Sequence, residues 1–286
     1  MRVAYLGPAG TFSEDALNAA AGGAEHEPAP MTTIHDAVLA VERGEADRAF
    51  VPFENSTEGS VRQTLDALAF DAPGVTIVGE HDQPISNSLI ARTSLQLSEI
   101  EVVVSHPQAS AQCARFLRDR LPGAEVRAAS STADAVREVS SAGRPWAALG
   151  AAGAAEIYDC VVLRSGVEDE PGNVTRFVWL APAGTESKGE GGWRTTLSFA
   201  ELGADHPGAL VEALTEFSSR AVNLVRIESR PLREAGLGRY MFFCDLEGRA
   251  AEPPVAEAIE ALRAKAESVR VLGSYPLRTA GIPGIG

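Results

Sequence analysis

Cysteine is scarce in this 286-residue sequence, with only Cys113, Cys160 and Cys244, which lie far apart in the chain. An odd number at such spacing provides neither a disulfide framework nor the CxxC pairs that hold zinc. Aromatic residues are also few, at 6%, whereas 45% of the residues are hydrophobic and 27 are glycine. The sequence therefore predicts one or two cores of closely packed small side chains, without a structural metal site.

Positive charge is the second shortage. Lysine and arginine number 25 against 39 aspartates and glutamates, which gives a net charge of −14. An acidic surface repels phosphate backbones and anionic lipid headgroups, so we expect neither nucleic acid nor a membrane as a partner. An anionic ligand would need a site made locally, from helix N-termini and a few well-placed donors.

Long hydrophobic runs are missing as well. No stretch approaches the ~20 apolar residues of a membrane-spanning helix. The opening segment, MRVAYLGPAGTFS, has no apolar run of signal-peptide length. The expected location is the cytoplasm.

Short apolar segments alternate with helical periods over the first 180 residues. Apolar spacing predicts a helix over residues 31–43, and strands are expected at residues 2–6, 49–53, 75–79, 88–92, 100–104, 125–128, 146–149 and 174–180. This alternation predicts an α/β fold with mostly parallel sheets. Ligands of such sheets bind at the carboxyl ends of the strands.

A second region follows a Gly-rich polar linker, APAGTESKGEGG, at residues 181–192. Strands are expected at residues 195–199, 222–229, 240–246 and 268–276, with helices at 208–220 and 255–266. The order βαββαβ is that of a ferredoxin-like module, and Asp205 can cap its first helix. The last ten residues show no periodicity.

Two polar segments of the first region follow expected strands. GPAGTFS, residues 7–13, places Thr11, Phe12 and Ser13 at a helix start, where free N–H groups can bind a carboxylate; an ordinary helix cap has the same pattern. VPFENSTEGSV, residues 51–61, crowds five polar side chains onto a strand end. This second segment fits either a binding site or an exposed hinge loop.

Two further segments carry single groups of interest. NVTRFVWL, residues 173–180, embeds Thr175 and Arg176 in an apolar strand. A buried arginine must find an anion, which can be a ligand or a structural ion-pair partner. SHPQASAQC, residues 105–113, contains His106, which we interpret as a capping or packing residue at a helix start.

Taken together, these segments resemble the prephenate dehydratase family over almost the whole chain. The resemblance rests on GPAGTFSEDAL, VPFENSTEGSV, SHPQASAQC and the Thr-Arg-Phe of residues 175–177, in the family's order. Farther on, PGALVEALTEF, NLVRIESRP, YMFFCDLEG and LGSYP resemble an ACT domain. Asn87 stands where relatives often have histidine, and we expect no chorismate mutase activity, because the sequence opens directly on its first expected strand.

The resemblance implies a catalytic part like type II periplasmic binding proteins, with two α/β lobes and a cleft between them. Lobe one would comprise residues 1–80 and 163–181, and lobe two residues 81–162. A linker at 182–193, an ACT domain at 194–277 and a tail at 278–286 would follow.

The resemblance also implies the site residues. Thr175 would hydrogen-bond or protonate the leaving hydroxyl, Arg176 would bind a carboxylate or organise the site from behind, and Phe177 would pack around the ring. Substrate binding is expected from Thr11, Phe12, Ser13, Asn55, Ser56, Thr57, Glu58 and Gly59. Aromatisation of the product drives the reaction, so neither a metal nor an organic cofactor is expected.

Phenylalanine is the effector that the ACT resemblance implies, bound between subunits of a homodimer or homotetramer formed through the ACT and catalytic domains. Its expected contacts are Gly208, Ala209, Leu210, Asn223, Leu224, Glu228, Ser229, Arg230 and Pro231, and variants at Gly208 or Ser229 should escape inhibition. Two alternatives stay open. Arogenate dehydratase performs the same chemistry, and a non-catalytic solute-binding or amino-acid-sensing protein can share the fold, although such a sensor would not need Thr175-Arg176-Phe177.

Overall fold

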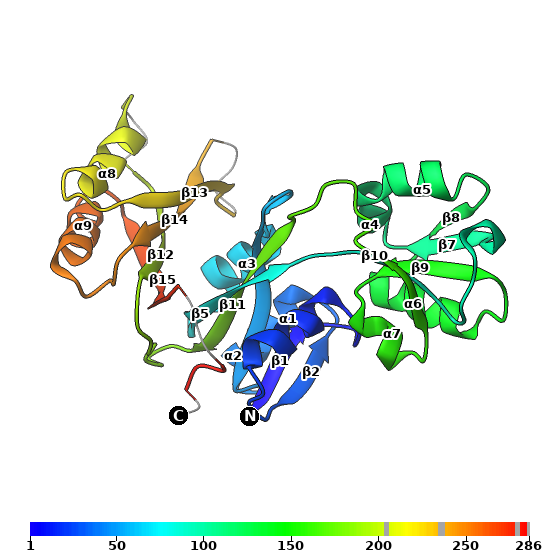
Figure 1. Cartoon of the computed structure of the whole chain (residues 1–286). Coiled ribbons are helices and arrows are strands. Elements are labelled where there is room, and N and C mark those ends of the chain that lie inside the picture. Colours follow the sequence, from blue (N-terminus) through cyan, green and yellow to red (C-terminus); the bar gives the residue numbers. More distant parts are fainter. Residues whose placement is uncertain (203–205, 234–237, 278–280, 285–286) are drawn as a thin grey trace.

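A computed structural model describes residues 1–202, 206–233, 238–277 and 281–284. Figure 1 shows three bodies in a row, with lobe one in the middle, lobe two on one side of it and a C-terminal module on the other. Lobe one is coloured mainly blue to cyan, lobe two mainly green, and the C-terminal module mainly yellow to orange. No helix within the described ranges is both long enough and apolar enough to cross a lipid bilayer.

Lobe one is built on strands in the order β5-β11-β3-β1-β2. Their bounds are β1 Arg2–Leu6, β2 Glu27–Met31, β3 Arg48–Asn55, β5 Val75–Pro84 and β11 Val174–Pro182, and the short β4, Gly59–Ser60, pairs with β3. The helices are α1 Phe12–Ala21, α2 Ile34–Glu42 and α3 Arg62–Asp66. One core lies under α2 and α3, and a second, with Leu17 and Trp179, lies under α1.

Strand β2 was not expected from the sequence. Its residues, EPAPM, include Pro28 and Pro30, which cannot donate to a neighbouring strand. The strand lies at the edge of the sheet, parallel to β1, where prolines are tolerated. Because β2 extends to Met31, the helix expected from residue 31 begins only at Ile34. The side chain of Thr33 caps its N-terminus.

Lobe two is a five-stranded sheet in the order β10-β6-β9-β7-β8. Its strands are β6 Ser88–Ala91, β7 Val102–Ser105, β8 Glu125–Ala128, β9 Trp146–Gly150 and β10 Val161–Ser165. Its helices are α4 Pro107–Gln112, α5 Ala114–Arg120, α6 Thr132–Ser141 and α7 Gly153–Ile157. The core residues of the two faces come from alternating positions of the strands.

The expectation of mostly parallel sheets is wrong. β1 is parallel to β2 and β3, and β7 is parallel to β8 and β9, but β11 is antiparallel to both of its neighbours. The reason is the crossing between lobes, because the chain leaves lobe one along β5 and returns beside it along β11. The crossings also lie a few residues later than expected, since β5 continues to Pro84 and β10 to Ser165.

The C-terminal module has the expected βαββαβ order. It comprises β12 Trp193–Ala200, α8 Ala209–Ser218, β13 Leu224–Pro231, β14 Tyr240–Glu247, α9 Pro253–Arg263 and β15 Ser268–Pro276. Phe199, Phe217 and Leu262 belong to the core between its sheet and its two helices. Helix α8 begins after Gly208, whose φ is 99°; Asp205, the expected cap, lies outside the described residues.

A close backbone contact joins the module to lobe one. Gly273 of β15 pairs in parallel with Ile77 of β5, so both sheets form one ten-stranded sheet. A Cβ atom at Gly273 would lie 2.2 Å from the carbonyl oxygen of Ile77. Only glycine permits this approach. Part of the tail also returns to lobe one, where Ile282 is buried in the core with Trp179.

Candidate active site

A cavity of about 810 Å³ is lined by residues of both lobes. Lobe one contributes Thr11, Asn55 and Thr175, and lobe two contributes residues such as His106 and Gln112. This volume is within the usual range for a small-molecule site, about 300–1,000 Å³. We call this cavity the cleft.

Helix starts from both lobes border the cleft. On lobe one, Thr11 caps α1 by accepting a hydrogen bond from Glu14 N, and Phe12 and Ser13 line the cavity. On lobe two, Ser131 caps α6 in the same way, and Thr132 lines the cavity. The first N–H groups of a helix have no intrahelical acceptor, so each start can bind a carboxylate. The structure thus places Thr11, Phe12 and Ser13 at the cleft.

The hydroxyl of Thr175 is held by Asn55. Asn55 Oδ1 accepts the backbone N–H groups of Thr57 (2.9 Å) and Glu58 (3.0 Å), which fixes the orientation of the amide. Asn55 Nδ2 therefore faces the cleft side, where it donates to Thr175 Oγ1 (2.8 Å) and to Asn173 Oδ1 (2.7 Å). Since Thr175 Oγ1 accepts this bond, its own proton remains to be donated.

The rest of the polar loop does not line the cleft. Thr57 and Glu58 present their N–H groups to Asn55, and Ser56 Oγ accepts from Val174 N (3.0 Å). Gly59 adopts a φ of 79° at the hairpin turn. The loop was expected to contact substrate throughout, but in the structure only Asn55 borders the cleft, and its neighbours position that side chain.

Arg176 lies on the opposite side of β11 from Thr175. Thr175 and Phe177 line the cleft, whereas Val174 and Arg176 line a second cavity toward the C-terminal module. Successive side chains of a strand point to opposite faces, so this separation follows from the strand geometry. A direct bidentate contact between Arg176 and the substrate does not fit this position, and the alternative expectation, support from behind, does.

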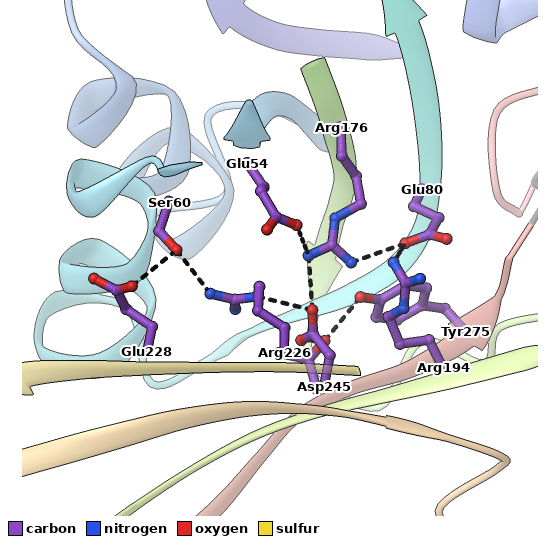
Figure 2. A network of polar contacts seen from close by, with 10 residues as sticks. Glu54, Ser60, Glu80, Arg176, Arg194, Arg226, Glu228, Asp245 and Tyr275 are labelled. Atoms are coloured by element: carbon purple, nitrogen blue, oxygen red, sulfur yellow. Dashed lines mark hydrogen bonds and ion pairs between the residues drawn. The ribbon is translucent and has the colours of Figure 1, made fainter. Parts of the chain in front are cut away.

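The guanidinium of Arg176 enters a buried ion cluster (Figure 2). It contacts Glu54 of β3 (2.9 Å), Glu80 of β5 (3.3 Å) and Asp245 of β14 (2.7 Å). Burial alone would raise the pKa of Asp245, but Arg226 and Arg176 outweigh it and lower the value to about 2. Asp245 is therefore ionised at neutral pH.

Glu80 in the same cluster behaves differently. Burial raises its pKa to about 7, although Arg194 and Arg176 oppose the rise. Asp82 adds to the rise through repulsion. A carboxyl group with a folded pKa above its unfolded value of 4.5 keeps a proton that the unfolded chain releases. The free energy of unfolding should therefore fall as pH rises from about 4.5 to about 7.

Replacing Glu80 with glutamine should remove this fall, which is on the order of 3 kcal/mol over the window. The measurement is urea denaturation of wild type and Glu80→Gln at pH 5, 6, 7 and 8. Relative to wild type, the variant should gain stability as the pH rises. Glu101→Gln, at an exposed position, is the control, and parallel curves for wild type and Glu80→Gln would contradict the prediction.

Several cleft residues on lobe two were not expected as site residues. They are Asn87, Gln108, Gln112, Ser130, Ser131 and Thr132, and Asn173 joins them from lobe one. His106 is confirmed as a cap, since its Nδ1 accepts from Gln108 N (3.3 Å), and it also lines the cleft. A signal for part of this set was present in the sequence, because Gln108 and Gln112 follow β7, and residues 130–132 follow β8, at the carboxyl ends of these strands.

Neither lysine nor arginine is found among the described residues that line the cleft. Among the described residues that line it, Asp134 is the one carboxylate, and its oxygens already accept from Ser130, Ser131 and Arg137. The hydrogen bond from Ser130 is the main reason that the pKa of Asp134 is lowered. The groups that remain for a ligand are backbone N–H groups at helix starts, hydroxyls and amides.

The residues expected to bind phenylalanine are split between two faces of the C-terminal module. Glu228 and Arg230 point toward lobe one, where they contact Ser60 (3.3 Å) and Asp66 (2.7 Å). Ser229 and Pro231 are exposed on the other face of β13. Gly208, Ala209 and Leu210 lie at the start of α8, and Asn223 and Leu224 at the start of β13.

This fold and cleft define a two-lobed protein with a cavity between its lobes and a βαββαβ module joined to lobe one. The prephenate dehydratase family model matches residues 3–185, and the ACT domain model matches residues 197–264. A prephenate dehydratase of Mycolicibacterium vanbaalenii is 42% identical, over 96% of this chain and 90% of its own. The chain belongs to the prephenate dehydratase family, lyases that remove water and carbon dioxide from prephenate, and its C-terminal module is an ACT domain.

Two solved structures are similar over nearly the whole chain. Prephenate dehydratase from Arthrobacter aurescens, in complex with L-Phe, is 39% identical with a TM-score of 0.88, covering 100% of this chain and 92% of its own. GqqA, a novel type of quorum quenching acylase, is 31% identical with a TM-score of 0.85, covering 97% and 98%. The fold by itself therefore does not fix the reaction, which depends on the residues of the cleft.

Proposed function

We propose that the cleft converts prephenate to phenylpyruvate, with Thr175 hydrogen-bonded to the leaving hydroxyl. The observation that carries this proposal is the fixed hydrogen bond from Asn55 to Thr175. A hydroxyl that accepts one hydrogen bond becomes a stronger donor of its own proton. Thr175 lines the cleft, so this proton is available to a substrate oxygen bound there.

Two bonds break in the reaction. The electron pair of the ring–carboxylate bond moves into the ring as carbon dioxide leaves, and the pair of the carbon–oxygen bond leaves with the hydroxyl. The hydroxyl becomes water when it takes a proton, and the ring becomes aromatic. The protein must therefore hold the dianion, exclude bulk water and stabilise charge on the leaving oxygen. Phe177, stacked on Phe50 with ring centroids 5.0 Å apart, forms an apolar part of this site.

The two carboxylates of prephenate match the two helix starts of the cleft. The N-termini of α1 and α6 belong to different lobes, so binding of one dianion between them would favour lobe closure. The side-chain amides of Asn87, Gln108 and Gln112 supply further donors. This arrangement supports anion binding in a protein with a net charge of −14.

The charges of the cleft favour prephenate over arogenate. Arogenate carries an ammonium group where prephenate has a keto oxygen, and an ammonium needs acceptors. Asp134, the carboxylate at the cleft, already accepts hydrogen bonds from Ser130, Ser131 and Arg137. We therefore expect a higher kcat/KM for prephenate.

Steady-state kinetics of the purified protein on both substrates test the proposal. Phenylpyruvate is followed by its absorbance in alkali, and phenylalanine formed from arogenate by chromatography. Rapid turnover of prephenate that phenylalanine suppresses is the expected result. A folded protein that converts neither substrate would overturn the assignment and favour the solute-binding alternative.

We further propose that phenylalanine binds between the ACT domains of two copies of this chain. Strand β13 is an edge of the described sheet, so one row of its backbone groups lacks a neighbouring strand. Val225 and Ile227 are 43% and 42% exposed on it, and Val211 of α8 is 67% exposed. An apolar edge strand of this kind is suited to pairing with a second copy.

Val225→Glu should therefore produce monomers and abolish inhibition by phenylalanine, while turnover of prephenate is retained. A charge at this edge costs binding energy because pairing would bury it. Sedimentation velocity and kinetics with phenylalanine measure the two effects. Val126→Glu is the matched control, since Val126 is 50% exposed on β8, an edge strand of lobe two. Unchanged assembly in Val225→Glu would contradict the proposed interface.

A further inference from the structure

Strand β11 separates the cleft from the surface that contacts the ACT domain. On one side Thr175 lines the cleft, and on the other Arg176 meets the ACT domain. The same holds for the neighbouring strand β3, where Asn55 borders the cleft and Glu54 faces the ACT domain. The register pairs Thr175 with Asn55 and Arg176 with Glu54. The Thr175–Asn55 pair, which orients the catalytic hydroxyl, is therefore followed along the strands by the Arg176–Glu54 pair, whose side chains lie on the opposite face of the sheet.

The ACT domain contacts the Arg176–Glu54 pair through Asp245. Asp245 of β14 has no exposed side-chain surface and contacts Arg176 Nη2 at 2.7 Å. The same carboxylate oxygen accepts from Arg226 Nε of β13 (2.9 Å), and its other oxygen accepts from Thr196 of β12 (2.8 Å). Three strands of the ACT domain thus determine where Asp245, and with it Arg176, lies (Figure 2).

The contact between Arg176 and the ACT domain includes an aromatic ring as well as ion pairs. The guanidinium groups of Arg176 and Arg226 lie 5.0 Å and 4.8 Å from the centroid of the Phe53 ring. The pairing of β3 with β11 shifts register at this point, so that Phe53 is passed over. A bulge of this kind turns the side chains next to it. The Arg176–Glu54 pair flanks it directly, and Thr175–Asn55 is the next pair along the strands.

A second set of hydrogen bonds connects β13 to the Arg176–Glu54 pair. Ser60 Oγ of β4 accepts from Arg226 Nη1 (3.0 Å) and contacts Glu228 Oε2 (3.3 Å). Ser60 pairs with Glu54 in the β3–β4 hairpin. Movement of β13 would therefore act on Glu54 from one side and on Arg176 from the other.

We infer that Arg176 is a positioning residue that acts through Thr175, and that Asp245 of the ACT domain sets its position. The C-terminal domain thereby controls turnover: a shift of β13 and β14 changes the Arg176–Glu54 pair and misaligns Thr175 with Asn55. This inference rests on the proposed role of Thr175 and on the proposed regulation by phenylalanine.

Asp245→Asn tests the inference in the full-length enzyme, because it removes the charge and keeps the shape. Without phenylalanine, kcat should fall about 10- to 100-fold, as for a small misplacement of a catalytic group, while KM stays within about twofold. Phenylalanine should still bind by isothermal titration calorimetry but change kcat less than about twofold. A substrate-binding role for Arg176 would instead raise KM.

Arg176→Lys is the second variant. It keeps a cation beside the buried carboxylates, so we expect it to fold even if Asp245→Asn does not. It should show the same fall in kcat at constant KM. Asp71→Asn is the matched control, because Asp71 pairs across the same domain boundary with Arg233 (2.7 Å), away from β11; its kcat and inhibition should equal those of wild type.

Wild-type kcat and wild-type inhibition in the folded variants would overturn the inference. A rise in KM at constant kcat would also overturn it. The wild-type enzyme is measured alongside in every assay. If it fails to convert prephenate or to respond to phenylalanine, the proposed function fails, and this result is distinct from failure of the inference.

Discussion

Alanine at position 175 should lower kcat by about 10²–10⁴-fold, the usual contribution of a positioned proton donor. The fold should be unaffected, because Thr175 is a cleft-lining side chain and not part of a core cluster. KM should change little, since the carboxylates of the substrate are assigned to the starts of α1 and α6. The measurements are kcat and KM on prephenate, together with the thermal unfolding midpoint.

Thr175→Ser is the control for this prediction. Serine keeps the hydroxyl that Asn55 contacts at 2.8 Å and loses only a methyl group, so most of the activity should remain. Wild-type turnover in Thr175→Ala would show that the hydroxyl is not required. An equal loss in both variants would show that the methyl group, and not the donor, is the important part.

Gly273→Ala should destabilise the protein by about 1–3 kcal/mol, the usual cost of forcing an extra methyl group into a packed site. The new Cβ would lie 2.2 Å from Ile77 O and 2.7 Å from Ile77 Cβ, so the strands must separate. Gly273 is also the position at which β15 pairs with β5. Loss of this pairing should loosen the ACT domain from lobe one, and unfolding should change from one transition to two.

Urea denaturation followed by circular dichroism and by tryptophan fluorescence measures this effect. Gly123→Ala is the matched control, since a Cβ at Gly123 meets nothing within 4 Å. Its free energy of unfolding should stay within about 0.5 kcal/mol of wild type. A similar loss in both variants would show that the contact with Ile77 has no special importance.

The sequence was informative wherever a local pattern determines structure. Local sequence patterns predicted the six elements of the C-terminal module, and the segment GPAGTFS predicted a helix start at Thr11. Strand β2 was missed because EPAPM has neither the alternation nor the β-branched residues of a strand. Its place in the sheet comes from tertiary pairing with β1.

The position of Arg176 was only partly predictable. Strand alternation alone shows that Thr175 and Arg176 cannot both face the cleft, and this part of the answer was present in the sequence. The partner was not, because Asp245 is 69 residues away and many carboxylates were available. In the same way, the role of the loop after β3 depends on two N–H groups that converge on Asn55, which no residue pattern reveals.

The shared sheet restricts how this regulatory domain can be exchanged between relatives. If recombination replaced residues after the linker with a homologous domain, Arg176 and Glu80 would stay behind while Asp245 and Arg194 were replaced. A foreign domain without an acidic residue at the position of Asp245 would remove the shortest ion pair of the buried Arg176, while its contacts with Glu54 and Glu80 would remain. One without glycine at the position of Gly273 could not join the sheet. Inheritance of the two parts as a unit is therefore favoured by the physics of their contact surface.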